Sequence, residues 1–540
     1  MEQLKIKKLK VQYKDKTIIR RIDFNINKGE VVCIAGESGS GKTTFIKAIT
    51  NILNNAKVEG EVIYNKKNLI NMKSSDLKEI RWTDISYVFQ NTKECLNPRM
   101  TLKNQLYEVL LKKYNHKEAY EKAKSVLKEV NLEEDILQKY PHQLSGGMLQ
   151  KFSIAMSICL DPQVIIFDEP TSSLDVLSKI FIVNIIEKLK SKNKTIIIVT
   201  HDLTLARKYS DKLIILYSGI IVESGDTKTI LDKPMHMYTK GLVNSSVDLN
   251  PYKELSGIPG VASYEDIGCP FYNRCTQHIE SCKIQTPKCN DYENRSVYCN
   301  RGGIVKLLEV ENISKSYNNS NILKECNMSL YFSEIVSIIG SSGCGKSTLA
   351  NIIAGFDKDF LGKIKLNTSE TSLKDMIKEF DGVQMVTQNP YDAINTNLSV
   401  FEVIGEPLSI KKMERDYILN EIKNILNIVG LSSDNLFLNT KVKLLSGGQV
   451  QRVAIARGLI MKPKILIADE ITSMMDPSNK ANILKYLKNL QQKIGFSMIF
   501  ITHDLNLATR ISDRIYVLNE GKLVGLGADS DYKKLESLIV

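Results

Sequence analysis

Short apolar runs followed by polar, glycine-rich turns recur along the chain and predict a mixed α/β fold. Residues 31–35 (VVCIA) form one such run, and a stretch with helical spacing, KTTFIKAITNIL, follows the next turn. The runs VIIFD, TIIIVT and KLIILY have the length and the β-branched composition of buried parallel strands. Longer amphipathic stretches between them, such as HKEAYEKAKSVLKEV, predict a helical subdomain inserted into an α/β core.

The same pattern occurs twice. IVSIIG, ILIADE and SMIFITHD repeat the apolar runs in order, and the segments GESGSGKT (36–43) and GSSGCGKS (340–347) follow the first run of each copy. LSGG segments, acidic pairs and Thr-His pairs recur at nearly one offset, about 300 residues. We therefore predict two homologous domains, residues 1–230 and 304–540, joined by a segment that spans 231–303.

The composition is that of a soluble globular protein and leaves the partner open. Hydrophobic residues make up 43% and charged residues 25% of the 540 residues, which excludes a disordered chain, a collagen and a coiled-coil rod. The net charge of +12 permits contact with a membrane surface or nucleic acid but requires neither. No apolar run reaches the roughly 18–20 residues that span a bilayer. The start, MEQLKIKKLKVQYKDK, lacks a signal-peptide core, so we expect a cytoplasmic chain.

Each repeat carries a GxxxxGK[ST] loop between a predicted strand and a predicted helix, which is the context of a phosphate-binding loop. Glycines let backbone N–H groups turn toward phosphate oxygens, and the helix adds the positive end of its dipole. We expect Lys42 and Lys346 to contact the β- and γ-phosphates, and Thr43 and Ser347 to place a hydroxyl on Mg²⁺. The predicted nucleotide-binding residues of the loops are Gly36, Glu37, Ser38, Gly39, Ser40, Gly41, Lys42, Thr43 and Thr44, and Gly340, Ser341, Ser342, Gly343, Cys344, Gly345, Lys346, Ser347 and Thr348.

An acidic pair ends a later apolar run of each repeat. Asp168 and Asp469 terminate predicted buried strands, where a carboxylate is costly unless it holds an ion such as Mg²⁺. Glu169 and Glu470 follow directly, and a carboxylate beside a metal site can orient and deprotonate an attacking water. These two glutamates are therefore the predicted catalytic bases for hydrolysis of the bound nucleotide.

With these motifs the sequence resembles the ATP-binding cassette (ABC) ATPases, whose distinctive mark is the LSGG segment. In that family two cassettes hold two ATP molecules head to tail, so that the P-loop of one cassette faces the LSGG of the other. The resemblance implies a P-loop α/β fold with a RecA-like core and a helical subdomain in each copy. It pairs Lys42 with Ser446, Gly447, Gly448 and Gln449, and Lys346 with Ser145, Gly146 and Gly147, which gives two competent ATPase sites.

The resemblance implies further roles. Gln90 and Gln388 match the Q-loop that senses Mg²⁺, water and the membrane partner, His201 and His503 match the switch histidine at the γ-phosphate, and Tyr13 and Tyr317 match the aromatic ring that stacks on adenine. The D-loops align at Ser173–Asp175 and Met474–Asp476. The implied Mg²⁺ residues are therefore Thr43, Gln90 and Asp168 in the first copy and Ser347, Gln388 and Asp469 in the second.

The surroundings of the Q-loops resemble one branch of the family, the importers of oligopeptides, dipeptides and nickel. VFQNTKECLNPRMTLKNQL and YPHQLSGGM resemble the D-type ATPase of that branch, VQMVTQNPY resembles its F-type partner, and KPMHMYTKGL resembles its C-terminal extension. The chain thus looks like a fused D–F pair, and fusion raises the effective concentration of one cassette for the other. The resemblance implies a motor on the cytoplasmic face of the membrane. Its partners would be two integral permease subunits and an extracytoplasmic substrate-binding protein, and its cargo peptides, nickel or metal chelates.

Five of the ten cysteines lie within residues 269–299. Cytosolic thiols stay reduced, so this clustering indicates metal rather than disulfides, but the spacing matches neither a zinc-finger template nor the ferredoxin run. The resemblance to the importer extension implies a [4Fe-4S] cluster on Cys269, Cys275, Cys282 and Cys299, with Cys289 as an extra cysteine. Structural zinc and plain reduced thiols remain open alternatives.

The rival interpretation is a soluble tandem ABC ATPase that acts on ribosomes or nucleic acid. Such proteins typically carry a long, charged helical linker between cassettes, whereas residues 231–303 are Cys-rich and contain proline. A nucleotide-binding scaffold without turnover is a second alternative, and the intact Glu169 and Glu470 argue against it. We therefore predict an import motor and expect no nucleic-acid partner.

Overall fold

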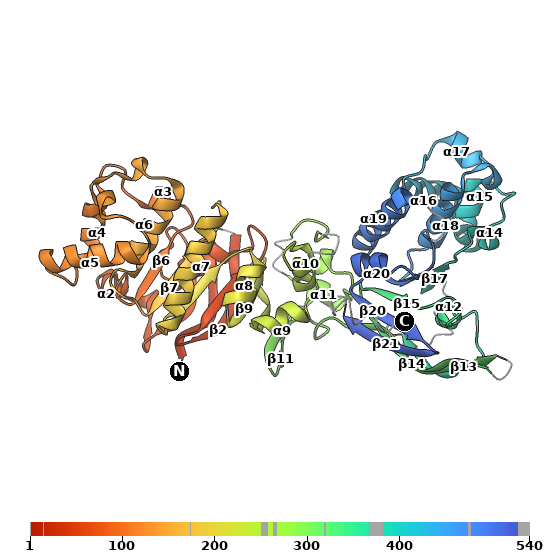
Figure 1. Cartoon of the computed structure of the whole chain (residues 1–540), viewed down its shortest axis with the longest axis horizontal. Coiled ribbons are helices and arrows are strands. Elements are labelled where there is room, and N and C mark those ends of the chain that lie inside the picture. Colours follow the sequence, from red (N-terminus) through yellow and green to blue (C-terminus); the bar gives the residue numbers. More distant parts are fainter. Residues whose placement is uncertain are drawn as a thin grey trace. The chain divides into compact units, whose positions relative to one another are not determined.

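The computed structural model describes residues 2–14, 16–172, 174–249, 257–262, 267–317, 320–366, 382–472 and 477–527. This part of the chain forms two compact units (Figure 1). The first contains residues up to 249 together with 261–273 and 279–303, and the second contains the others. Residues of the predicted connecting segment are therefore divided between the units.

A mixed sheet forms the core of the first unit. Its strand order is β11-β12-β10-β9-β3-β8-β7-β6, with parallel pairing from β9 through β6. All residues of β3, β7 and β8 are buried, as expected for parallel strands that are covered on both faces. The strands are β3 (Val31–Ala35), β6 (Ile85–Val88), β7 (Val164–Asp168), β8 (Thr195–Val199), β9 (Lys212–Tyr217), β10 (Ile220–Asp226), β11 (Cys289–Tyr292) and β12 (Arg295–Tyr298).

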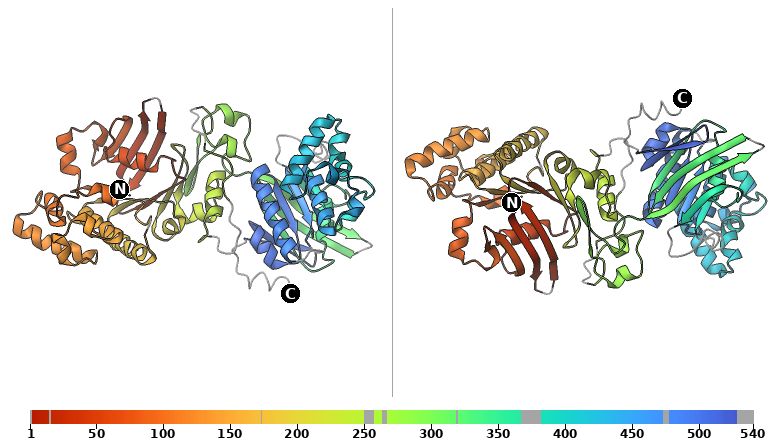
Figure 2. Two further views of the ribbon diagram at one scale, coloured as in Figure 1. Left: turned by 90° about the horizontal axis from the view of Figure 1, so that it is seen from above. Right: turned by 90° about the horizontal axis from the view of Figure 1, so that it is seen from below.

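An antiparallel sheet, a helical lobe and helices along the core complete this unit. In both views of Figure 2 the red antiparallel strands lie apart from the orange helices of the lobe. Leu106, Ala123 and Phe152, from three lobe helices, share one buried cluster. The antiparallel order is β2-β1-β4-β5, with β1 (Glu2–Tyr13), β2 (Lys16–Asn27), β4 (Lys57–Tyr64) and β5 (Lys67–Asn68). The helices are α1 (Lys42–Ile49), α2 (Ser74–Ile80), α3 (Thr92–Cys95), α4 (Leu102–Leu110), α5 (His116–Glu129), α6 (Gly146–Ile158), α7 (Val176–Ser191), α8 (Leu203–Tyr209), α9 (Thr227–Asp232), α10 (Met237–Ser245) and α11 (Ser281–Ile284).

The second unit repeats this plan. Its core sheet has the order β17-β18-β19-β15-β20-β21, and its antiparallel sheet has the order β14-β13-β16. The strands are β13 (Lys306–Tyr317), β14 (Ser320–Tyr331), β15 (Ile335–Ile339), β16 (Leu361–Leu366), β17 (Val383–Val386), β18 (Ile465–Asp469), β19 (Ser497–Ile501), β20 (Arg514–Asn519) and β21 (Lys522–Gly527). The helices are α12 (Lys346–Ile353), α14 (Pro390–Ala393), α15 (Val400–Ile410), α16 (Arg415–Ile428), α17 (Asn435–Asn439), α18 (Gly447–Leu459), α19 (Pro477–Ile494) and α20 (Leu505–Ile511).

These two units confirm the predicted pair of α/β domains with inserted helices. Over the described ranges, no helix is both long and apolar enough to cross a membrane.

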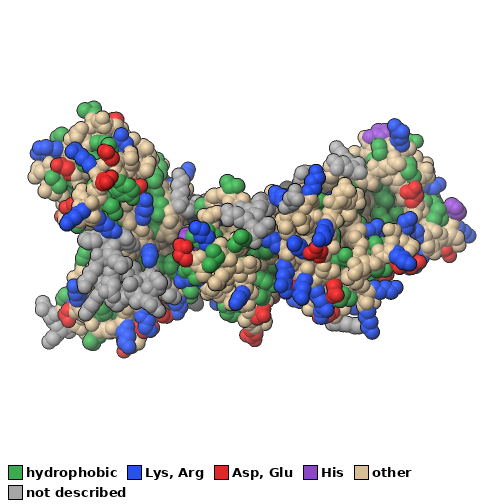
Figure 3. Space-filling model, turned by 180° about the vertical axis from the view of Figure 1, so that it is seen from behind, with side chains coloured by type: hydrophobic (Ala, Val, Ile, Leu, Met, Phe, Trp, Pro, Cys, Tyr) green, Lys and Arg blue, Asp and Glu red, His purple; other side chains and the backbone are tan. Residues whose placement is uncertain are grey.

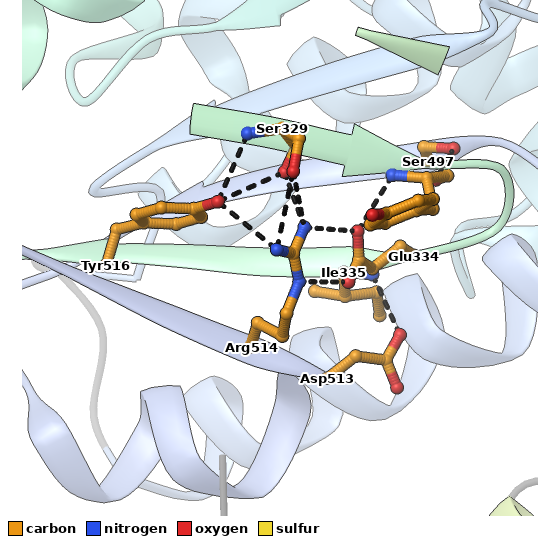
Figure 4. Close-up of polar contacts among 8 residues, drawn as sticks. Ser329, Glu334, Ile335, Ser497, Asp513, Arg514 and Tyr516 are labelled. Carbon is orange, nitrogen blue, oxygen red and sulfur yellow. Dashed lines mark hydrogen bonds and ion pairs between the residues drawn. The ribbon is translucent and has the colours of Figure 1, made fainter. Parts of the chain in front are cut away.

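An arginine clamp holds the strand that leads into the second P-loop (Figure 4). Arg514, at the start of β20, donates from Nε and Nη2 to the two carboxylate oxygens of Glu334 at 2.6 and 3.0 Å. Nη2 also donates to the carbonyl of Ser329 on β14 at 2.5 Å. The neighbouring Asp513 accepts the N–H of Ile335 at 3.1 Å. The clamp therefore ties β15 to β20 and to the antiparallel sheet at once.

The first unit has the same plan with a lysine. Lys212 Nζ lies 2.8 Å from Glu30 Oε1, and Asp211 accepts the N–H of Val31 at 2.9 Å. A single ammonium cannot make the two-point contact of a guanidinium, so this clamp is the weaker of the two.

The segment after the first core folds back onto that core. Strand β12 pairs with β10, and β11 pairs with β12. Glu223 of β10 is fully buried, and it accepts the N–H groups of Met235 and His236 at 3.0 and 2.9 Å and a hydrogen bond from Arg295 Nη1 at 3.2 Å. Because its charge is paired and its oxygens are bonded, Glu223 can anchor the start of α10 and β12 from inside the protein.

Candidate nucleotide-binding sites

The first P-loop joins β3 to α1 and uses conformations that glycine allows. Gly39 and Gly41 have φ angles of 80° and 101°, in the left-handed region. Lys42 Nζ donates to the carbonyls of Gly36 and Glu37 at 2.8 and 2.9 Å. The loop itself therefore holds the lysine ammonium.

The second P-loop joins β15 to α12 with the same geometry. Gly343 and Gly345 have φ angles of 80° and 106°, and Lys346 Nζ donates to the carbonyls of Gly340 and Ser341 at 2.9 and 2.8 Å. The remaining predicted residues lie in the same two loops or in the first helical turns after them: Ser38, Ser40, Thr43, Thr44, Ser342, Cys344, Ser347 and Thr348.

A carboxylate at the end of β7 faces the first loop. Thr43 Oγ1 donates to Asp168 Oδ1 at 3.4 Å, and the Tyr87 hydroxyl donates to Asp168 Oδ2 at 2.6 Å. Burial raises the pKa of Asp168, while the two hydroxyl donors lower it. Burial lowers the pKa of Lys42, while the charges of Glu169 and Asp168 raise it. Charge and hydroxyl groups thus gather where a metal–phosphate complex would need them.

The matching carboxylate at the end of β18 has fewer partners. Burial raises the pKa of Asp469, and a hydrogen bond with Ser347 lowers it. Met385 stands where the first copy has Tyr87, and Asp469 Oδ1 is buried with no hydrogen-bond partner among the described residues. A Mg²⁺ ion, or a water of its shell, would satisfy this oxygen, so the donor set fits magnesium.

A glutamine and a histidine converge on the glutamate of the first site. Gln90 Nε2 donates to Glu169 Oε2 at 3.3 Å, and His201 Nδ1 lies 3.4 Å from the same oxygen. Two residues that are far apart in the sequence are thus brought to one carboxylate.

The second site has the same arrangement. Gln388 Nε2 donates to Glu470 Oε2 at 3.1 Å, and His503 Nδ1 lies 3.7 Å from that oxygen. Lys346 Nζ lies 4.0 Å from Glu470 Oε1. Glu169 and Glu470 have φ angles of 47° and 45°, a region that costs non-glycine residues energy and that is often found at functional sites.

The LSGG segments begin helices α6 and α18. Ser145 Oγ accepts the N–H of Met148 at 3.3 Å, and Ser446 Oγ accepts the N–H of Gln449 at 3.4 Å, so both serines are N-caps. Open space surrounds the α-carbons of Gly146, Gly447 and Gly448, whereas a Cβ at Gly147 would meet Ser178 Oγ at 3.0 Å. Each LSGG and the P-loop that it is expected to face belong to different units, so that pairing stays a prediction.

Two tyrosines end the first strands of the antiparallel sheets. Tyr317 is 49% exposed, and its hydroxyl donates to Asp357 Oδ2 at 2.9 Å, whereas Tyr13 is partly buried against the first unit's core. Stacking on adenine stays a prediction for both. Ser173 and Met474–Asp476 of the predicted D-loops lie outside the described residues.

The structure gives no support to a metal site on the cysteines of the connecting segment. Cys269, Cys282 and Cys299 belong to the first unit and Cys275 to the second, and none of the four is part of a disulfide. In the described part of the chain, no group of three or more His, Cys, Asp or Glu side chains could hold a metal ion. The predicted [4Fe-4S] cluster and its zinc alternative are therefore without support.

The sequence interpretation missed two tyrosines at the first site. Tyr87 interrupts the strand ISYV, and its polar hydroxyl was the available signal. Tyr238 of α10 accepts the N–H of Glu37 at 2.7 Å. It lies in the KPMHMYTKGL element, but nothing in the sequence connects that element to a P-loop.

Comparisons with known proteins match both cores and the segment between them. A family model described as "ABC transporter" matches residues 19–172 and 323–473, and a model described as "Oligopeptide/dipeptide transporter, C-terminal region" matches residues 222–282. The first two ranges contain both P-loops, both LSGG segments and both acidic pairs. The third contains the Glu223 anchor and Tyr238.

Curated relatives match over nearly the whole chain. The "Glutathione import ATP-binding protein GsiA" of Salmonella choleraesuis (strain SC-B67) is 29% identical and covers 94% of this chain and 83% of its own length. The "Uncharacterized ABC transporter ATP-binding protein YejF" of Escherichia coli (strain K12) is 29% identical and covers 95% of this chain and 92% of its own length. A solved bacterial ABC transporter cassette, MJ0796, is 31% identical over 42% of this chain and 99% of its own, with a TM-score of 0.39.

Proposed function

The chain belongs to the ABC transporter family, and on that premise we propose that it is the ATP-hydrolysing subunit of a peptide importer. The observation that carries the proposal is that two cassettes with complete sets of nucleotide-site residues share one chain with an oligopeptide/dipeptide-type extension. Relatives named for glutathione import support peptide cargo, because glutathione is a tripeptide. Nickel or a metal chelate is the alternative cargo that the resemblance implies.

In this proposal the P-loops bind the ATP phosphates. Lys42 and Lys346 exchange their backbone carbonyl partners for phosphate oxygens as nucleotide enters. Thr43 with Asp168, and Ser347 with Asp469, would hold the Mg²⁺ ion, which would supply positive charge to the phosphates.

Glu169 and Glu470 accept the proton of the attacking water. Each carboxylate is restrained by a glutamine and a histidine, so its orientation is set before the water arrives. Gln90 and Gln388 would report the state of this carboxylate to the partner, and His201 and His503 would contact the γ-phosphate.

The two cassettes act as a pair within one chain. The first P-loop works with Ser446, Gly447, Gly448 and Gln449, and the second works with Ser145, Gly146 and Gly147. The N-capped starts of α6 and α18 suit a γ-phosphate because a helix N-terminus attracts anions and a Cβ at Gly146, Gly447 or Gly448 would meet nothing within 4 Å. ATP closes the pair and hydrolysis opens it.

Two integral permease subunits receive this motion at the cytoplasmic face of the membrane, and an extracytoplasmic binding protein delivers the cargo. In the first cassette an apolar cavity of about 200 Å³ lies beside the Q-loop, and Trp82 and Phe89 are among its lining residues. Phe89 directly precedes Gln90. An apolar surface next to the Q-loop suits a permease helix, since such patches mark protein contacts.

The comparisons give no support to a ribosomal or nucleic-acid partner. Figure 3 shows Lys and Arg side chains dispersed over the visible face among Asp and Glu.

Uptake of labelled glutathione and dipeptides by intact cells tests the proposal. Cells that carry Glu169→Gln with Glu470→Gln should lose ATP-dependent uptake, and the tagged protein should co-purify from detergent-solubilised membranes with two membrane-spanning subunits. Unchanged peptide uptake in the double variant would refute the proposed cargo. Sedimentation with ribosomes instead of membranes would favour the rival function.

A further inference from the structure

A residue outside the nucleotide motifs holds the first P-loop. The N–H of Glu37 donates to the hydroxyl of Tyr238 at 2.7 Å. Tyr238 lies on α10, about 200 positions further along the chain, and its side chain is fully buried. In the described part of the second unit, no tyrosine bonds to the matching amide, that of Ser341.

This hydrogen bond acts on the peptide that holds the P-loop lysine. The N–H of Glu37 and the carbonyl of Gly36 belong to the same planar peptide group, and that carbonyl accepts from Lys42 Nζ at 2.8 Å. Tyr238 on one edge of the plane therefore fixes the direction of the oxygen on the other edge. A side chain at position 36 could not hold this peptide group instead, because a Cβ there would lie 2.2 Å from the carbonyl oxygen of Leu216.

Tyr238 is in turn held by the extension. Its ring centroid lies 4.5 Å from that of Tyr217 and 5.7 Å from that of Phe271, and its N–H donates to His236 Nδ1 at 3.1 Å. Phe271 is 2% exposed and stands two residues after Cys269, whose N–H donates to the carbonyl of Cys282 at 2.7 Å. Contacts within one unit thus run from the Cys-rich segment to the P-loop.

We propose that Tyr238 is a positioning residue of the first ATP site, through which the Cys-rich segment around Phe271 sets the affinity of the first P-loop for nucleotide. This inference rests on the proposed ATP-binding role of Lys42. It predicts that the two ATP sites differ, because only the first is held in this way among the described residues.

The single tryptophan of the chain, Trp82, lies in the first unit and serves as the energy donor for nucleotide bound at the first P-loop. Energy transfer from Trp82 to a fluorescent mant-ATP reports binding there, and Lys346→Ala silences the second site. Tyr238→Phe removes the hydroxyl alone, and Phe271→Leu keeps the hydroxyl but alters the ring that supports it. Tyr64→Phe is the matched control, because Tyr64 is another buried tyrosine of the first unit.

Tyr238→Phe should raise the mant-ATP Kd of the first site roughly three- to tenfold, the effect of one hydrogen bond. Phe271→Leu should change it in the same direction, and Tyr64→Phe should leave it unchanged. In steady-state hydrolysis the KM for ATP should rise while kcat changes little, which general loosening of the fold would not produce. If Tyr238→Phe does not fold, the mant-ATP Kd of Phe271→Leu at the first site tests the inference instead.

Lys42→Ala separates this inference from the proposed function. If Lys42→Ala abolishes binding at the first site while Tyr238→Phe and Phe271→Leu bind as the wild type does, the inference is overturned and the proposed function stands. If Lys42→Ala binds normally, the proposed role of the P-loop itself fails. An equal rise in the ATP Kd of the second site, measured by filter binding with Lys42→Ala in the background, also overturns the inference.

Discussion

The Tyr87 hydroxyl lies 2.6 Å from Asp168 Oδ2 and donates to it. With Thr43 on Oδ1, both oxygens of this buried carboxylate have a donor. The second copy has Met385 in place of Tyr87, and Oδ1 of its aspartate, Asp469, is buried without a described partner. The two proposed magnesium sites therefore differ in their local chemistry.

Tyr87→Phe should destabilise the first unit when no Mg²⁺ is present. The change leaves one buried carboxylate oxygen without a donor, so we expect the free energy of unfolding to fall by about 1–3 kcal/mol. Mg²⁺ with nucleotide should recover part of the loss, because the ion interacts with the same carboxylate. Urea titrations followed by Trp82 fluorescence measure this, and Met385→Leu in the other unit should leave that transition unchanged. A loss that Mg²⁺–nucleotide does not reduce would count against Asp168 as a magnesium residue.

Glu169→Gln and Glu470→Gln should each trap ATP rather than prevent its binding. Glutamine keeps the shape of the side chain and can still bond to Gln90 or Gln388, but it cannot accept the proton of water. Loss of a general base slows turnover by roughly 10²–10⁴-fold. Phosphate release gives the rate and filter binding gives the trapped ATP. An unchanged rate of ATP hydrolysis in these variants would show that the two glutamates do not act as catalytic bases.

Much of the fold could be predicted because short-range patterns specify it. The apolar runs at residues 31–35 and 164–168 form fully buried strands, and GxxxxGK[ST] needs only local backbone geometry to form a P-loop. The choice of Gln90 and His201 as site residues came from the family resemblance and not from spacing, and their convergence on Glu169 is a finding of the structure.

The parts that could not be predicted depend on long-range contacts. Glu223 and Arg295 pair across 72 positions, and Tyr238 reaches Glu37 across 201. The glutamate within the strand IIVESGD, Glu223, indicates a buried charge, but the sequence does not show which residue pairs with it. The predicted metal site also required several cysteines to lie close together, and among the described residues no group of three or more ligating side chains does so.

Arg514→Lys should loosen the strand before the second P-loop. The arginine makes a two-point contact with Glu334 and also reaches Ser329, whereas a lysine cannot form that fork. We expect a loss of about 1–2 kcal/mol in local stability, seen as faster hydrogen exchange in peptides that contain β15 and β20. Lys212→Arg, at the matching position of the first unit, is the reciprocal control and should not accelerate exchange in β3. Wild-type protection of β15 in Arg514→Lys would show that the clamp has no effect on stability.

The first unit should lose stability on mild acidification because of His236. Burial lowers the pKa of this imidazole from 6.5 to about 4, and its Nδ1 must stay unprotonated to accept the N–H of Tyr238. Between pH 6.5 and about 4, His236 is protonated in the unfolded chain but stays neutral in the folded chain. Stability is therefore full above pH 6.5 and falls toward pH 4, by at most about 3 kcal/mol.

His236→Asn isolates this contribution, since asparagine is a good N-cap and does not titrate. Glu223 is the other titratable group at this anchor, and burial raises its pKa, so protonation of Glu223 on acidification acts in the opposite direction. Urea titrations of Trp82 at several pH values should show a stability loss in the wild type that is reduced or reversed in His236→Asn. Parallel pH profiles for the two proteins would mean that His236 titrates normally in the folded chain. The structure predicts profiles that diverge below pH 6.5, because there the proton competes directly with the N–H of Tyr238 for Nδ1.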